Sequence, residues 1–185
     1  MLKIKVTLSL LIYFSLSLNS LSDEKDELLN KITNLNTLEF TFDQTVNNKI
    51  EKGICLLQFP GKLKCLYFDK KQKELIINNG KLAITQKRYN KTYYYPFSKS
   101  PFLNILYKEK LLEIIKSGKL EKSENKLQLI YNDKSDLTIL FNKSDLELSG
   151  WKITDQYNNE IVLNLKIISK NSSFPKKTFQ FPGRN

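Results

Sequence analysis

The two cysteines are the first residues of this chain whose type and spacing could support chemistry. Cys55 and Cys65 are the only thiols, and nine residues separate them, which excludes the Cys-x-x-Cys spacing of a redox-active pair. Pro60-Gly61 lies between them and indicates a hairpin turn that would bring the cysteines nearly opposite each other. A register shift of one residue reverses the face of a side chain. The sequence therefore leaves open whether the two form a structural disulfide.

The other polar residues give little support for catalysis. The chain contains no histidine, which removes the commonest general base, the usual catalytic zinc ligands and every Ser-His-Asp or Cys-His arrangement. Asp69, Asp133, Asp136 and Asp155 lie in turns or beside lysines, as solvated carboxylates do. We therefore expect no catalytic residue, no metal site and no cofactor, and we predict that the protein is not an enzyme.

The charge balance is strongly basic, yet it does not favour a nucleic-acid partner. Lysine and arginine total 30 against 19 acidic residues, which gives a net charge of +11. Only Arg88 and Arg184 are arginines, whereas base and phosphate recognition favours the planar guanidinium. We interpret the lysines as a solvated surface. A basic face that visits anionic membranes or acidic partners is the alternative.

The N-terminus has the pattern of a secretory signal. Residues 1–5 carry two lysines and no acid, residues 6–18 carry no charge, and small residues precede Asp23. This order is typical of a signal peptide, and the uncharged run is shorter than the about 20 residues that span a bilayer. We predict that residues 1–22 are removed and that residues 23–185 form one domain outside the cytoplasm. A retained membrane anchor is the alternative.

The rest of the chain predicts an α+β fold. Apolar residues recur at helical spacing over 23–35, and again over 102–116, where one or two short helices should end at Gly118. Alternating apolar and polar residues predict strands around these helices, with Asn79-Gly80 as a hairpin turn and a bulge at Gly150. The predicted strands cover residues 38–44, 50–59, 64–69, 74–77, 81–86, 91–95, 127–131, 137–141, 146–153 and 161–167. Together they favour a strongly curved antiparallel sheet or an unclosed β-barrel.

Five short motifs occur in an order and spacing that point to one family. They are Leu-Glu-Phe-Thr-Phe-Asp-Gln at 38–44, Phe-Pro-Gly-Lys-Leu-Lys at 59–64, Ile-Ile-Asn-Asn-Gly-Lys-Leu at 76–82, Ser-Pro-Phe at 100–102 and Gly-Trp-Lys-Ile-Thr-Asp at 150–155. Over about residues 23–181, this series resembles the LolA family, the periplasmic carriers of outer-membrane lipoproteins. The last motif is similar to a strand of alphaproteobacterial members.

The resemblance implies an unclosed barrel covered by a lid of short helices, with an apolar cavity for acyl chains. It further implies a monomer in the periplasm that receives acylated lipoproteins from an inner-membrane ABC transporter and passes them to an outer-membrane receptor. By position, Leu63 matches a residue that faces the transporter. The residues expected to line the lipid cavity are Phe40, Phe42, Leu57, Phe59, Tyr67, Leu82, Ile84, Phe102, Leu103, Leu106, Ile139 and Trp151.

Two departures from the family pattern concern the lid. The family usually has an arginine before the turn proline, where it holds the lid closed, and this chain has Phe59 there. Cys65 stands where an aromatic residue is common. The resemblance therefore leaves the closing mechanism open. Two alternative functions are a carrier or sensor of another lipid or envelope protein, and an envelope-lipid hydrolase that acts through carboxylates.

Overall fold

The computed structural model describes residues 23–96, 102–131, 136–155 and 158–183. The predicted signal peptide, Asp133 and the Ser100-Pro101 step lie outside these residues. Among the described residues, every helix is too short or too polar to span a bilayer.

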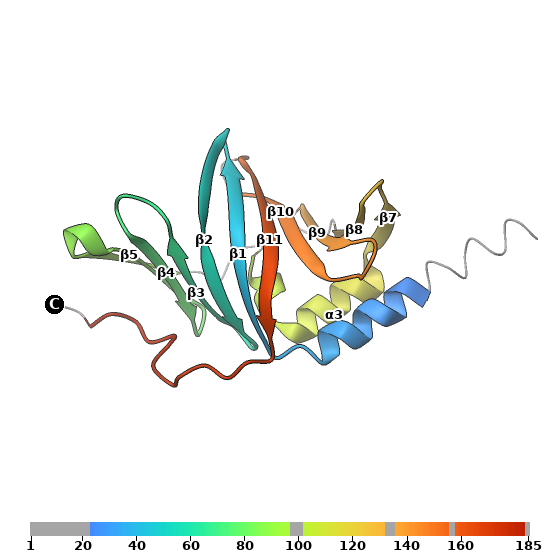
Figure 1. The fold of residues 1–185 in the computed structure, drawn as a ribbon, viewed down its shortest axis with the longest axis horizontal. Coiled ribbons are helices and arrows are strands. Elements are labelled where there is room, and N and C mark those ends of the chain that lie inside the picture. Colours follow the sequence, from blue (N-terminus) through green and yellow to red (C-terminus); the bar gives the residue numbers. More distant parts are fainter. Residues whose placement is uncertain (1–22, 97–101, 132–135, 156–157, 184–185) are drawn as a thin grey trace, which may run out of the picture.

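In the described residues, a single antiparallel sheet of 11 strands forms the body of the molecule (Figure 1). Its spatial order is β6-β5-β4-β3-β2-β1-β11-β10-β9-β8-β7, so β6 and β7 are edge strands and the sheet does not close into a barrel. The expected unclosed antiparallel fold is thereby confirmed. The strands are β1 (Thr37–Val46), β2 (Lys49–Gln58), β3 (Lys62–Tyr67), β4 (Lys73–Asn78), β5 (Lys81–Gln86), β6 (Lys91–Pro96), β7 (Lys119–Lys122), β8 (Lys126–Tyr131), β9 (Leu137–Asn142), β10 (Leu148–Thr154) and β11 (Glu160–Lys170).

Local turn chemistry explains how consecutive strands pair. Asn79 and Gly80 both have positive φ angles, 50° and 67°, which a two-residue hairpin turn requires. Asn47 and Asn48 adopt the same left-handed region between β1 and β2, a turn that the sequence analysis did not identify. The predicted bulge is confirmed, since the β9–β10 register shifts between Leu148 and Gly150. Gly150 has a φ of 151° there, which a residue with a side chain rarely adopts.

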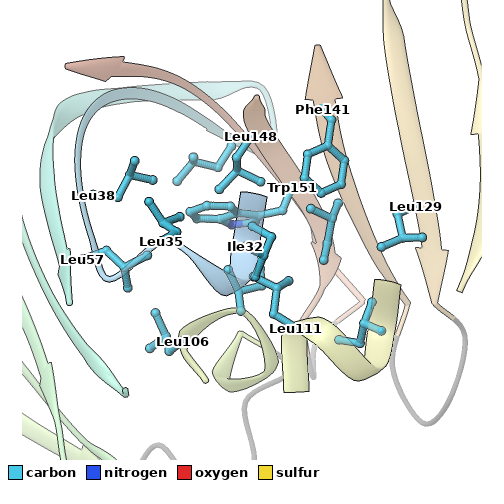
Figure 2. Packing of buried hydrophobic residues seen from close by; sticks show 14 of the residues in the cluster. Ile32, Leu35, Leu38, Leu57, Leu106, Leu111, Leu129, Phe141, Leu148 and Trp151 are labelled. Atoms are coloured by element: carbon cyan, nitrogen blue, oxygen red, sulfur yellow. The ribbon is translucent and has the colours of Figure 1, made fainter. Parts of the chain in front are cut away.

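The helices cover one part of the concave face of the sheet. The N-terminal helix spans residues 23–33, and the predicted second helical segment divides into α2 (Leu103–Leu106) and α3 (Lys108–Ser117). Gly118 ends α3 as expected, with its N–H donating to the Ile114 carbonyl at 2.7 Å. Lys25 of the N-terminal helix also donates to the Gly118 carbonyl (2.8 Å), which joins the two long helices. Figure 2 shows their apolar side chains packed against Trp151 and the strands.

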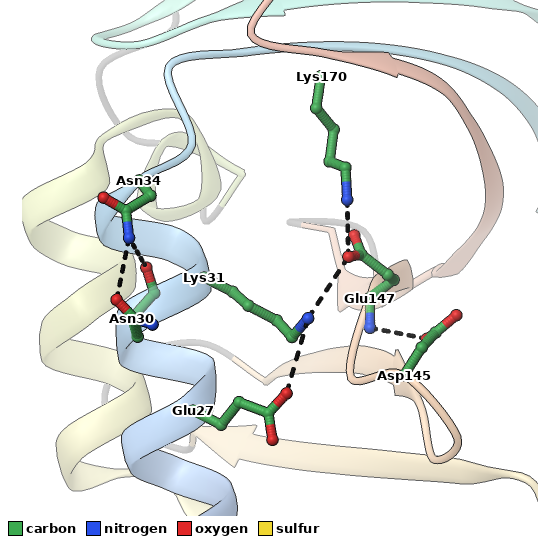
Figure 3. Close-up of polar contacts among 7 residues, drawn as sticks. All are labelled: Glu27, Asn30, Lys31, Asn34, Asp145, Glu147 and Lys170. Carbon is green, nitrogen blue, oxygen red and sulfur yellow. Dashed lines mark hydrogen bonds and ion pairs between the residues drawn. The ribbon is translucent and has the colours of Figure 1, made fainter.

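Ion pairs fix the N-terminal helix over the sheet (Figure 3). Lys31 Nζ lies 3.6 Å from the carboxylates of both Glu27 and Glu147. Glu147 precedes β10 and also pairs with Lys170 of β11 at 2.7 Å. Such partly exposed pairs contribute about 1 kcal/mol or less each. They therefore orient the helix more than they stabilise it.

The C-terminal segment adds a smaller apolar layer on the opposite face of the sheet. Phe179 is 4% exposed, and its carbonyl accepts a hydrogen bond from Asn78 Nδ2 at 3.2 Å. Further along, the Tyr94 hydroxyl donates to the Pro182 carbonyl at 2.9 Å. This segment thus runs from β11 past β4 to β6. Neither this layer nor strand β7 was expected from the sequence.

Candidate functional site

The concave face of the sheet is divided into a filled part and a hollow part. Under the helices, Leu57, Leu106 and Ile139 are at most 3% exposed and belong to a continuous core. Figure 2 shows how side chains from α3, the N-terminal helix and β10 meet there around Trp151. Beyond Trp151, towards β3 and β4, no helix in the described residues is inserted, and a cavity remains.

The cavity has a volume of about 180 Å³ and an almost entirely apolar wall. Strands on both sides of β1 contribute to the wall, and Phe102 closes it from the segment that leads into α2. Among the described lining residues, Gln44 supplies the only side-chain amide. The lining residues are Phe40, Phe42, Gln44, Cys55, Leu63, Cys65, Tyr67, Leu75, Ile77, Phe102, Trp151, Ile153, Ile161 and Leu163.

Aromatic rings contribute much of this wall. The Phe42 and Tyr67 rings lie edge to face with their centroids 5.1 Å apart, and the Phe102 and Trp151 centroids are 5.2 Å apart. Such ring pairs are apolar, and their geometry contributes stabilisation beyond that from burial of the rings. Burial raises the pKa of the Tyr67 hydroxyl, and the negative charges of Glu51 and Asp69 raise it further. Tyr67 therefore stays neutral and behaves as part of an apolar surface.

The cysteines are joined within the cavity wall. Cys55 and Cys65 occupy directly opposed positions on β2 and β3, with 4.1 Å between their Cα atoms, and they form a disulfide. Both side chains are at most 4% exposed. The register that the sequence left open thus places both sulfur atoms on the concave face. The disulfide locks β2 to β3 beside the apolar space.

The residues expected to line a lipid cavity fall into two groups. Phe40, Phe42, Tyr67, Phe102 and Trp151 border the cavity. The others lie elsewhere on the same face, in α2 or next to the β2–β3 turn. Leu57, Leu106 and Ile139 are core residues, Phe59, Leu82 and Leu103 are partly buried against that core, and Ile84 is half-buried on β5.

Leu63 differs from its expected position. The resemblance placed it on a surface that faces a transporter, but its side chain is 4% exposed and borders the cavity. Strand alternation explains the correction, because Leu63 lies two residues before Cys65 and so shares its inward face. Leu75, Ile77 and Leu163 are lining residues that the sequence analysis did not single out. The alternation of apolar and polar residues in these strands could have indicated that the three side chains face inward. Whether a cavity remains in front of them depends on where the helices pack.

The apolar surface continues from the cavity towards β6. Ile84 pairs with both Leu75 and Tyr93, so the row that begins at Cys65 extends across β4, β5 and β6. Tyr93 and Tyr95 on the edge strand are 44% and 47% exposed. The inward face therefore becomes progressively more open beyond the cavity. It offers an apolar shelf along which a long chain could extend.

Contacts of the helices with one another and with the β2–β3 turn hold them over the concave face beside the cavity, an arrangement called here the covered form. The Gly61 N–H donates to the Leu106 carbonyl of α2 at 2.7 Å. Gly61 has a φ of 68°, and a Cβ atom there would lie 2.9 Å from the Tyr107 ring. Lys108 Nζ donates to the Thr33 carbonyl and to Asn36 Oδ1, both at 3.0 Å. The same ammonium lies 5.8 Å from the Phe59 ring centroid, within the range of a cation–π contact.

A second space is less suited to an apolar ligand. It has a volume of about 210 Å³ and lies between the N-terminal helix and strands β9 to β11. Lys31, Glu147 and Lys170 border it, and their ion pairs cross its rim. Among the described residues, no cluster of three or more His, Cys, Asp or Glu side chains is arranged to hold a metal ion.

Comparison with known proteins defines the class to which this fold and cavity belong. The profile of the family described as outer membrane lipoprotein carrier protein LolA matches residues 33–182. The chain is therefore a member of the LolA family. Among curated proteins, no sequence matches the chain significantly.

Solved structures share the fold at low sequence identity. An uncharacterized conserved protein from Thermus thermophilus superposes with a TM-score of 0.53 at 8% identity, over 90% of this chain and 94% of that one. A chain of the Pseudomonas aeruginosa MucA/MucB complex gives 0.50 at 10% identity, over 86% of this chain and 61% of its own length. A LolA superfamily protein from Nitrosomonas europaea gives 0.44 at 9% identity, over 84% and 97%.

Proposed function

We propose that the protein is a periplasmic chaperone that shelters the acyl chains of lipoproteins and carries them from the inner to the outer membrane. The supporting observation is an apolar cavity of about 180 Å³ on the concave face of the sheet, in a member of the LolA family. In this proposal residues 1–22 direct export and are removed, and residues 23–185 are the working domain. Sheltering requires no bond-making chemistry, so the protein is not an enzyme.

The cavity size suggests how such a carrier would operate. Each methylene kept from water is worth about 0.8 kcal/mol, so a multiply acylated protein does not cross an aqueous space unaided. A cavity of 180 Å³ is close to the about 150 Å³ that holds one benzene molecule. The covered form therefore has room for a short segment of one chain. Full loading requires the helices to move away and the shelf towards β6 to be used.

The contacts that hold the helices in the covered form are weak enough to be broken. The Gly61–Leu106 bond joins two buried residues, whereas the Lys108 contacts are exposed. Each of these contacts contributes on the order of 1 kcal/mol. Here Lys108 stacked near Phe59 takes the place of the arginine that the family usually has before the turn proline. Weak contacts of this kind suit a carrier that must release its cargo.

The proposed partners follow from the same task. Acylated lipoproteins are the cargo, an inner-membrane ABC transporter is the donor, and an outer-membrane receptor is the acceptor. Leu63 is now proposed as a cavity residue, which would contact a partner only when the helices are displaced. No nucleic acid is involved, and the carrier acts as a monomer.

Release of a newly made lipoprotein from spheroplasts tests the proposal. Protein exported and processed from the full chain should bring labelled lipoprotein into the soluble fraction. A matched lipoprotein whose acylated cysteine is replaced should reach the soluble fraction without the added protein. Purified lipidated and delipidated forms should then bind with different affinities. Equal binding of the two forms would reject acyl-chain recognition.

A second candidate is a carrier or sensor of the same shape for another lipid or an envelope protein. The structural similarity to the MucA/MucB complex favours keeping it, because that fold is used there in a protein–protein complex. Mass spectrometry of ligands extracted from the purified protein separates the two. Phospholipids or a co-purified polypeptide without acyl modification would favour the second candidate.

A further inference from the structure

The end of the molecule farthest from α3 carries a compact basic and aromatic surface. Two loops meet there, the β3–β4 loop (residues 68–72) and the segment 87–91, which contains the 3-10 helix η1 (Lys87–Tyr89). Figure 1 shows η1 at the outer edge of the sheet, on the side away from the helices. We call these ten residues the basic tip.

Backbone contacts hold the two loops side by side. The Arg88 N–H donates to the Lys71 carbonyl at 3.3 Å, and the Lys87 N–H donates to the Gln72 carbonyl at 3.4 Å. The Phe68 N–H donates to the Lys52 carbonyl of β2 at 2.8 Å, which fixes the start of the first loop. The basic tip is therefore one surface built from segments that are separated in the sequence.

The charge of the basic tip is strongly positive. Its ten residues include five cations and a single acid, Asp69, for a net charge of +4. Asp69 is engaged in the turn, since its carboxylate accepts the Lys73 N–H at 3.0 Å. Lys87 is paired with the buried Glu74 at 2.7 Å. Four exposed cations remain to act outwards: Lys70, Lys71, Arg88 and Lys91.

Large apolar side chains stand among these cations. Phe68 is 69% exposed and Tyr89 is 52% exposed, although burial of either ring would be favourable in water. A solvated surface that only maintains solubility needs no exposed phenylalanine. Aromatic rings flanked by lysines instead match the interfacial region of a membrane, where rings sit at headgroup level and cations contact anionic headgroups.

We propose that the basic tip docks the protein on the surface of a bilayer that contains anionic phospholipid. Lys70, Lys71, Arg88 and Lys91 attract the headgroups, while Phe68 and Tyr89 enter the interface. Tyr67, which borders the cavity, directly precedes Phe68. Docking thus places one end of the cavity wall next to the bilayer. The inference concerns the protein without cargo, so it stands whether or not the cargo is a lipoprotein.

Vesicle flotation of the processed protein tests this docking. The protein should float with vesicles of phosphatidylcholine containing about 30 mol% phosphatidylglycerol, and should do so far less with phosphatidylcholine alone. Each basic residue near such a surface changes partitioning about fivefold, so Lys70→Gln with Lys71→Gln should lower it about 25-fold. The matched control is Lys176→Gln with Lys177→Gln, an adjacent exposed pair in the C-terminal segment. It should change partitioning by about threefold or less, because charges beyond a Debye length are screened.

The aromatic contribution is tested separately. Phe68→Ser should lower partitioning about tenfold at unchanged charge. Phe68→Trp should give a blue-shifted emission on anionic vesicles, against the constant signal of Trp151, which is only 3% exposed. Three results would overturn the proposal: an equal loss of partitioning in both lysine double variants, unchanged partitioning of Phe68→Ser, or equal flotation with vesicles of phosphatidylcholine alone. Binding of lipidated lipoprotein by the Lys70, Lys71 variant should be unchanged, which separates this result from the test of the proposed function.

Discussion

Lys108 offers the sharpest test of how the helices are held over the concave face. Its ammonium donates to the Thr33 carbonyl and to Asn36 Oδ1, each at 3.0 Å, and lies 5.8 Å from the Phe59 ring centroid. These contacts tie α3 to the N-terminal helix and to the residue before the β2–β3 turn. Lys108→Met removes all of them and keeps a good helix former of similar length.

The expected size of the effect follows from these contacts. Two partly exposed hydrogen bonds from a cation contribute about 0.5–1 kcal/mol each after solvent screening, and the ring contact adds about 0.5 kcal/mol. Lys108 is the first residue of α3, where a positive charge costs about 0.5 kcal/mol against the helix dipole. The net loss is therefore about 1.5 kcal/mol, and the uncovered form should become roughly tenfold more populated.

Hydrogen exchange at Gly61 measures this opening directly. Its N–H donates to the Leu106 carbonyl of α2, so this amide exchanges when the helices move away from the turn. Lys108→Met should accelerate its exchange about tenfold. The control is Lys116→Met, an exposed lysine of the same helix, which should leave the rate within about twofold. An unchanged Gly61 rate, or equal acceleration of the core amide of Trp151, would refute the reasoning.

Three further predictions concern the cavity wall. Replacing Cys55 and Cys65 by alanine should lower the free energy of unfolding in urea by about 3 kcal/mol, as expected for the 10-residue separation of this disulfide. A reductant should lower the free energy of unfolding of the parent protein by a similar amount. No change would show that the bridge does not constrain the unfolded chain. Burial raises the pKa of Tyr67, so the unfolded protein loses the tyrosine proton first, and stability should fall as pH rises above about 10. In Tyr67→Phe, the free energy of unfolding from urea titrations should decrease less between about pH 8 and pH 11 than in the parent protein. An equally large decrease would show that other groups cause the pH dependence. Leu75→Trp should fill the cavity and weaken binding of a fluorescent fatty acid about 30-fold, the cost of losing two or three sheltered methylenes, while Leu66→Trp on the opposite face of β3 should not; equal binding by both variants would place the acyl site elsewhere.

The local features of the fold were determined by the sequence alone. Alternation placed Phe40 and Phe42 on the inward face, Asn79-Gly80 specified a hairpin, and the phase change at Gly150 predicted the bulge. Each of these depends on backbone geometry within a few residues, so a local pattern suffices to predict it. The ordered motifs also pointed to the LolA family, which the family match over residues 33–182 shows.

Only the tertiary structure decided which inward residues border an empty space. Leu57 and Ile139 alternate in the same way as Phe40, but α2, α3 and the N-terminal helix fill the region in front of them. The pairing of β1 with β11 joins residues more than 100 positions apart, and no local pattern encodes such a contact. The same is true of the basic tip, because hydrogen bonds between two distant loops bring Lys71 and Arg88 together. Whether an apolar side chain is core, cavity wall or exposed surface depends on what packs against it, and that is set by the whole chain.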